Sequence, residues 1–140
     1  MQLTKHTDFA FRILIYLAST DEELTKIKQL SDGFDISKSH VMKIVNKLVH
    51  HGWVASVRGK NGGICLGSAP QDVRLNEVVE LMEQTLDPVN CEEPMCALTS
   101  ACKLKGMLLK AQGEYLAHLA QFTLADLVDR KMIGVVRLIE

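Results

Sequence analysis

The sequence predicts a mainly α-helical (α+β) fold, with a winged helix-turn-helix followed by a long C-terminal dimerisation helix. Three observations support this prediction. Apolar residues recur at helical spacing in three successive segments before residue 52. Two short segments of strand character follow, on either side of a glycine-rich turn. A long segment after residue 100 is then apolar on more than one helical face, as in helices that pack against two bodies.

The first two predicted helices lie close to the N-terminus. Apolar spacing predicts a helix over residues 8–19, and Thr7 is expected to accept a hydrogen bond as its N-cap. A second, short helix is expected over residues 26–32. Thr25 is the expected N-cap of this helix, and Gly33 is expected to end it. The two helices together form the first part of a helix-turn-helix.

The third predicted helix begins after Ser37, which is its expected N-cap, and ends at Gly52. Its apolar stripe consists of Val41, Ile44, Val45, Leu48 and Val49. Its opposite face carries Ser39, His40, Lys43, Lys47 and His50. A helix that is apolar on one side and basic on the other is expected to pack on a core and to present its basic face to a partner.

A β-hairpin is predicted directly after this helix. Residues 53–57 and 63–66 have strand character, and the intervening residues 58–62 contain the Asn-Gly pair of a tight hairpin turn. Three helices followed by a hairpin with a basic tip form a winged helix-turn-helix.

The charge distribution favours a nucleic-acid partner, although the net charge is only −1. No acidic residue lies between Asp35 and Asp72, whereas five Lys/Arg and three His residues do. An acid-free basic window of this kind is typical of a phosphate-binding surface. The residues expected to contact DNA are Lys38, Ser39, His40 and Lys43 in the major groove, and Arg58, Lys60 and Asn61 on the wing. The alternatives are a solvated basic face and a helix-turn-helix that serves as a protein interface.

The second half of the chain is expected to carry the dimer contacts. Helices are predicted over residues 75–86 and 100–122, with an exposed loop at residues 87–96 between them. A short capped helix is expected after Thr123, against the dimer interface. The chain thus divides into a DNA-binding region, residues 1–72, and a region for the loop and the dimerisation helices, residues 73–140. A two-fold homodimer would match the symmetry of palindromic operator DNA.

Three cysteines, Cys91, Cys96 and Cys102, lie within twelve residues at the start of this second region. Thiolates are soft ligands for iron–sulfur clusters or zinc, and the spacing leaves both open, together with plain reduced thiols. Three thiolates also leave one coordination position to another group. Cys65 lies apart on the predicted wing, and no role is assigned to it.

Several motifs resemble the nitric-oxide-sensing repressors of the Rrf-type (IscR/RirA-like) winged-helix family, over essentially the whole chain. The motifs are Met1–Thr4 with Thr7-Asp8, His40–Leu48, Val57–Gly63, Val89–Cys91, Phe122–Val128 and the cysteine triplet. The resemblance implies a homodimeric repressor with a [2Fe-2S] or [4Fe-4S] cluster, which releases operator DNA when nitric oxide nitrosylates the cluster. It also implies Cys91, Cys96 and Cys102 as cluster ligands. Asp8 would be a tentative fourth ligand, supplied from the opposite subunit; alternatively, it complements the helix dipole.

One departure and two alternatives accompany this interpretation. IscR-type members have a histidine three residues after the last cysteine, where this chain has Lys105. The main alternative is an Fe–S or iron-status, redox-sensing regulator of the same fold. An enzyme is not expected, because no histidine shares a catalytic motif with a cysteine. No apolar run is long enough for a membrane span and no secretory segment is apparent, so we expect a cytoplasmic protein that does not bind membranes.

Overall fold

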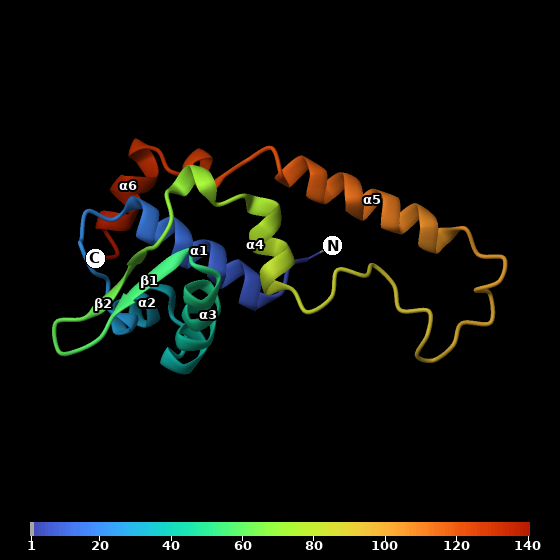
Figure 1. Cartoon of the computed structure of the whole chain (residues 1–140), viewed down its shortest axis with the longest axis horizontal. Helices are drawn as coiled ribbons and strands as arrows, with labels where there is room; N and C mark the ends of the chain where they lie inside the picture. The colour runs from blue at the N-terminus through green and yellow to red at the C-terminus, as the bar shows by residue number, and fades with distance from the viewer. Residues whose placement is uncertain (1) are drawn as a thin grey trace.

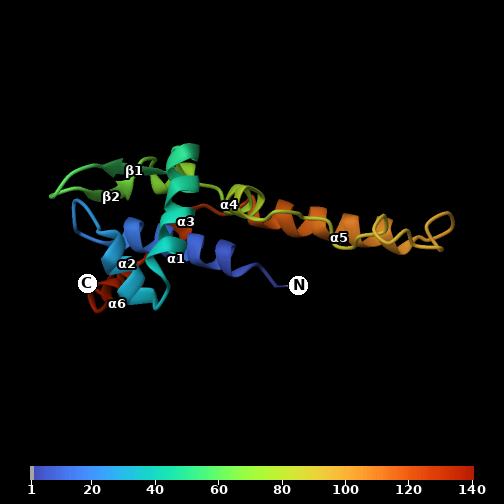
Figure 2. The same ribbon diagram turned by 90° about the horizontal axis from the view of Figure 1, so that it is seen from below.

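The computed structural model describes residues 2–140 and consists of a compact head and a projecting arm (Figure 1). The head contains α1, α2, α3, a two-stranded antiparallel sheet, α4, two short 3-10 helices and α6. The arm consists of α5 and the irregular segment that precedes it, and it extends away from the head in both views (Figure 2). The bounds of the elements are α1 Lys5–Ser19, α2 Ile27–Phe34, α3 Lys38–His51, β1 Val54–Val57, β2 Gly63–Leu66, η1 Pro70–Asp72, α4 Leu75–Met82, α5 Leu104–Leu119, η2 Leu124–Leu127 and α6 Arg130–Arg137. The predicted fold class is confirmed.

Helix α1 crosses the centre of the head and starts earlier than predicted. The side chain of Thr4, not Thr7, caps it by accepting a hydrogen bond from the backbone N–H of Thr7. Thr7 itself is buried in the first turn. Ala10, Ile13 and Leu14 have no exposed surface and form the centre of the core.

Helix α2 also differs from the prediction at both ends. Thr25 is not its N-cap, because the backbone of Thr25 pairs with Ile64 of β2 through two hydrogen bonds of 2.8 and 2.9 Å. Lys26 occupies the N-cap position instead. Gly33 does not end the helix either, since the left-handed residue at the C-terminus is Asp35, with φ 51°.

Helix α3 has the predicted caps. The Ser37 hydroxyl accepts a hydrogen bond from the N–H of His40 at 3.2 Å, and Gly52 ends the helix with φ 95°. The four residues Val41, Ile44, Val45 and Leu48 of the predicted apolar stripe are buried, and Val49 is half-buried. The hydrophobic period of the sequence therefore fixes which face of α3 is turned to solvent.

The predicted hairpin is present, and its loop has the predicted bounds. The register pairs Val54 with Leu66 and Val57 with Gly63, so the loop consists of residues 58–62. Gly59 takes the positive φ in this loop, at 108°. The loop closes through a 3.0 Å hydrogen bond from the N–H of Gly62 to the carbonyl of Gly59.

The head has one hydrophobic core to which both halves of the chain contribute. Helix α4 ends at Met82 rather than at residue 86, and its residues Val78 and Met82 are buried against α1. Leu124 of η2 is fully buried in the same core, so the short capped helix expected after Thr123 packs on α1. The structure describes no helix that is long and apolar enough to cross a membrane.

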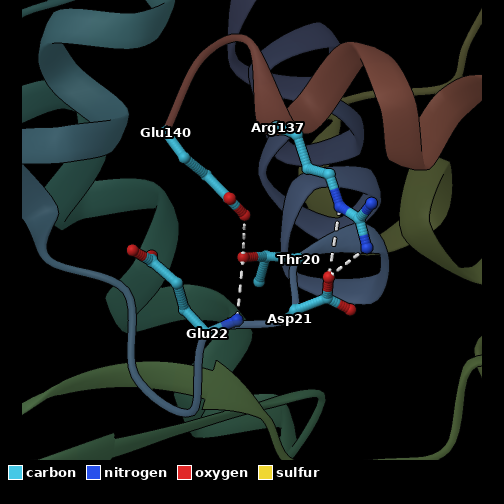
Figure 3. A network of polar contacts seen from close by, with 5 residues as sticks. All are labelled: Thr20, Asp21, Glu22, Arg137 and Glu140. Carbon is cyan, nitrogen blue, oxygen red and sulfur yellow. Dashed lines mark hydrogen bonds and ion pairs between the residues drawn. The ribbon is translucent and has the colours of Figure 1, made fainter.

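Helix α6 was not predicted, and it holds the C-terminus against the head. Val136 is buried in the core, and the Arg137 guanidinium forms an ion pair with Asp21 at 2.5 Å. The Glu140 carboxylate accepts a hydrogen bond from the Thr20 hydroxyl, next to this ion pair (Figure 3). Residues 137–140 therefore contact the segment between α1 and α2 through an ion pair and a hydrogen bond.

Candidate DNA-binding surface and cysteine loop

The predicted DNA-contacting residues lie on two parts of the head, α3 and the hairpin loop, and both parts contribute residues to one hollow. Lys38, Ser39, His40 and Lys43 lie in the N-terminal half of α3, and all but the half-buried His40 are exposed. Arg58, Lys60 and Asn61 lie in the exposed hairpin loop, which we call the wing loop. No acidic side chain of α3, β1 or β2 interrupts this surface. The basic side chains of α3 and of the wing loop can therefore both bind DNA phosphates.

A histidine pair connects α1 to α3 at the edge of this surface. The rings of His6 and His40 are stacked, with centroids 5.6 Å apart, and His6 Nδ1 lies 3.4 Å from His40 Nε2. Burial lowers the pKa of His6, and the positive charges of His40 and Lys47 lower it further. The neutral form of the His6 ring is therefore favoured. Sequence reasoning missed His6, because no local motif indicates it.

A second residue that sequence reasoning missed holds the wing loop. The ammonium group of Lys26, at the start of α2, donates to the backbone carbonyls of Lys60 (3.2 Å) and Gly62. Since the loop has few internal hydrogen bonds, this contact sets its position relative to α2. Lys26 is therefore a positioning residue for the wing.

A carboxylate network connects the beginning of α1 to the point where the arm leaves the head. Glu83, at the end of α4, accepts hydrogen bonds from the Thr7 hydroxyl (2.6 Å), the Thr4 N–H (2.9 Å) and the Thr4 hydroxyl (3.1 Å). Desolvation opposes ionisation of Glu83, but these hydrogen bonds outweigh it and hold the pKa of Glu83 below its usual range. The ionised carboxylate thus completes the N-cap of α1.

The three clustered cysteines lie in the segment between α4 and α5, residues 83–103, which we call the cysteine loop. All three carry free thiols; Cys91 and Cys96 are half-buried and Cys102 is exposed. The N–H of Cys96 donates to the carbonyl of Cys91 at 3.0 Å, so these two residues are the ends of one closed turn. Within residues 2–140, no three His, Cys, Asp or Glu side chains converge as a metal site.

The chemistry of these donors nevertheless fits an iron–sulfur cluster. Three unpaired, accessible thiols on one short loop are soft ligands, and none is committed to a disulfide. Cys65 is half-buried on β2, opposite Ala55, and far from the others in sequence. Cys91, Cys96 and Cys102 are therefore the donor set suited to such a group.

Asp8, the candidate fourth ligand, lies in the first turn of α1. Its carboxylate accepts two hydrogen bonds from Arg12, at 2.7 and 3.0 Å, and its side chain is about half exposed (45%). Both partners are open to solvent, so this i, i+4 ion pair adds little stability. Asp8 remains accessible to a group from outside its own subunit.

The arm leaves an unusual amount of apolar surface uncovered. No residue of α5 is buried, and Leu104 and Met107 are more than half exposed. A cavity of about 560 Å³ lies between the residues that precede α1, helix α4 with the segment after it, and α5; Leu3, Val79, Leu108 and Tyr115 are among its lining residues. A helix with this composition would be poorly stable alone in water, which indicates a missing packing partner.

A winged helix-turn-helix with an acid-free basic face defines a DNA-binding transcriptional regulator. Residues 3–130 match the Rrf2 family, whose description is "Iron-dependent Transcriptional regulator". The chain therefore belongs to the Rrf2 family of transcriptional regulators, and this is not a family of enzymes.

Solved structures of similar proteins share this fold. CymR (YrzC), described as the global cysteine regulator of B. subtilis, is 23% identical with a TM-score of 0.70, over 91% of this chain and 95% of that one. The IscR of T. potens is 20% identical with a TM-score of 0.70, over 90% of this chain and 85% of that one. The CymR of Staphylococcus aureus is 20% identical with a TM-score of 0.68, over 86% and 93% respectively. At these identities the likeness shows the fold alone.

Proposed function

We propose that this chain is a homodimeric, iron–sulfur-cluster-containing repressor of the NsrR type, which releases operator DNA when nitric oxide reacts with the cluster. One observation carries the proposal: three free thiols lie on the loop that joins a basic winged head to α5, a helix with no buried residue. Membership of a family described as iron-dependent supports an iron-containing group. The whole-chain sequence resemblance supports nitric oxide as the signal.

DNA binding would use both basic elements of the head. The N-terminal half of α3 presents Lys38, Ser39 and Lys43 to the major groove, with His40 at its edge. Arg58, Lys60 and Asn61 of the wing loop reach the phosphates or the minor groove next to it. Lysine contacts of this kind supply affinity that falls with salt, whereas contacts of Ser39 and His40 to base edges supply operator preference.

The dimer would form through α5 of two copies. A second copy is the occupant that best fits the arm, because the exposed residues follow one long helix and a two-fold pair of helices covers both sets at once. The same symmetry presents two α3 helices to the two halves of a palindromic operator.

The cysteine loop would hold the cluster through Cys91, Cys96 and Cys102, and Asp8 of the other subunit is the proposed fourth ligand. When bound, an iron–sulfur cluster supplies iron that reacts with nitric oxide. The loop begins at Glu83, which caps α1, and ends at α5. A change in the loop can therefore alter how each head is held on the dimer and shift an existing equilibrium between binding and non-binding arrangements.

The decisive experiment follows absorbance and operator binding together. Anaerobically purified protein should be coloured, since an iron–sulfur cluster absorbs visible light and zinc does not. Nitric oxide titrated into this protein should bleach the chromophore and release operator DNA with the same stoichiometry. Bleaching without loss of operator affinity would contradict nitric-oxide sensing and favour the alternative function, an iron-status or redox-sensing regulator.

Cysteine variants provide the matched controls. Cys102→Ser should abolish the chromophore, whereas Cys65→Ser should leave it intact, because Cys65 lies on the wing strand. Asp8→Ala should retain the chromophore in a more labile form. A colourless wild-type protein that contains one zinc ion per chain would refute the iron–sulfur assignment.

A further inference from the structure

One large apolar side chain lies within the otherwise polar exposed face of α3. Met42 is the fifth residue of the helix and is 52% exposed, whereas the apolar residues Val41, Ile44 and Val45 beside it are buried. Its neighbours one turn away in either direction are Lys38 and Asn46, both exposed. Met42 therefore belongs to the surface proposed to meet DNA, and it contributes nothing to the core.

The surroundings of Met42 form a hollow between α3 and the hairpin. The hollow has a volume of about 500 Å³, and Met42, Asn46, Val57 and Lys60 contribute to its lining. Val57 of β1 is also 52% exposed. The hollow is open toward solvent and has lysines at its edge, so an apolar peptide is a less suitable occupant than nucleic acid.

The chemistry of the major groove narrows what Met42 can contact there. The base edges in this groove carry hydrogen-bond donors and acceptors, and their one apolar group is the C5-methyl of thymine. A thioether side chain has no hydrogen bond of consequence to offer, but it is flexible and polarisable enough to pack on a methyl group. Burial of Met42 by DNA is favourable only where it meets such a group.

We propose that Met42 is a specificity-determining residue that reads the methyl group of one thymine in each operator half-site. The inference rests on the DNA-binding function proposed above and extends it, because Lys38, Ser39, His40 and Lys43 account for polar and charged contacts only. It predicts a thymine whose 5-methyl group, rather than its hydrogen-bonding pattern, is recognised.

The test replaces thymine by uracil, which removes only that methyl group. The full-length protein, purified anaerobically, first selects its operator from a random duplex library, and each dT of a half-site is then changed to dU. Wild-type affinity should fall about three- to fivefold at one position of each half-site, the factor expected from burying one methyl group. At the other positions it should change by less than about 1.5-fold.

The same substitution is repeated in variants of the protein. In Met42→Ala the uracil effect should fall below about 1.5-fold, and Met42→Leu should restore it, while the salt dependence of both stays that of wild type because no phosphate contact is lost. Val135→Ala is the matched control, because Val135 is an exposed apolar residue of α6 (46%) that does not line the hollow, and it should retain the full uracil effect.

The outcomes separate this inference from the function on which it rests. Sequence-specific binding with no uracil effect, or an equal effect in wild type and Met42→Ala, would overturn the role of Met42 and leave the DNA-binding function standing. Failure of the cluster-loaded protein to select any DNA sequence would overturn both.

Discussion

The N-cap network of α1 can be tested by replacing one buried hydroxyl. Thr7 has no exposed surface, and its hydroxyl donates the shortest of the three hydrogen bonds to Glu83, at 2.6 Å. Thr7→Val keeps the β-branched shape and removes this donor. A hydrogen bond to a charged group contributes roughly 1.5–3 kcal/mol. Because Glu83 keeps both bonds from Thr4, we expect a loss of about 1–2 kcal/mol in the free energy of unfolding.

Urea denaturation at a fixed protein concentration measures this loss, because the apparent stability of the proposed dimer would depend on concentration. The melting temperature should fall by roughly 3–8 °C for a chain of this size. Thr85→Val is the control, since Thr85 is exposed and its hydroxyl accepts only a local bond from the N–H of Asp87. That variant should change stability by less than about 0.5 kcal/mol.

The pH dependence provides a second, independent check. The pKa of Glu83 is lowered in the folded protein, so its stabilising contribution is present above the ordinary glutamate pKa and is lost as the pH falls through the folded value. The loss in the free energy of unfolding caused by Thr7→Val should therefore be largest near about pH 7 and should become smaller below about pH 4. Equal stability of the two proteins at neutral pH, or a deficit that persists undiminished in acid, would refute this account of the network.

Three further predictions concern the surface and the arm. Lys60→Ala should weaken binding to all DNA sequences and reduce the salt dependence by about one counterion, measured by titration at several salt concentrations; an unchanged slope would exclude Lys60 from phosphate contact. Because the folded pKa of His6 is lowered, its contribution to stability is lost as the pH falls below the ordinary histidine range, so His6→Gln should flatten the decrease in stability between about pH 7.5 and about pH 5.5 in urea titrations. Met107→Glu, on the exposed side of α5, should shift the protein toward monomers in sedimentation equilibrium, whereas Lys110→Glu on the same helix should leave a dimer intact.

The sequence predicted the elements of the head well where the residues that determine an element lie within that element. Ser37, the apolar stripe of α3 and Gly52 all belong to one helix, and all three have the predicted roles. The predictions of helix ends failed where a contact with a distant segment determines which residue caps the helix. Thr4 and Thr7 are both possible caps of α1, and Glu83, more than seventy residues away, places Thr7 inside the helix. Thr25 could have capped α2, but β2 pairs with its backbone.

Gly33 has a structural role, but not the predicted one. The sequence suggested a helix end, yet Asp35 provides it. A Cβ atom at position 33 would lie 2.4 Å from Cγ2 of Ile139, so the small side chain allows the C-terminal segment to approach α2. Helix α6 was missed although Asp129 is a suitable N-cap, whose side chain accepts a hydrogen bond from the N–H of Met132 at 2.7 Å. Gly134 weakens the helical pattern of its eight residues, and burial of Val136 in the core stabilises them.

The positions of the three sulfur atoms in the cysteine loop could not be predicted from the sequence. None of residues 83–104 is buried, so no packing within this chain fixes the mutual positions of the three sulfurs. The sequence could indicate that the thiols form a set, but it could not predict their mutual geometry, because the loop has no buried residue to fix it. The exposed apolar surface of α5 begins where this loop ends. In the proposed dimer, subunit contacts and ordering of the loop would therefore involve the same stretch of chain, and the proposed ligand from the opposite subunit, Asp8, lies on the helix that Glu83 caps. Each contact that orders the loop would thus also restrain the head, which is the physical requirement for a sensor that controls DNA binding.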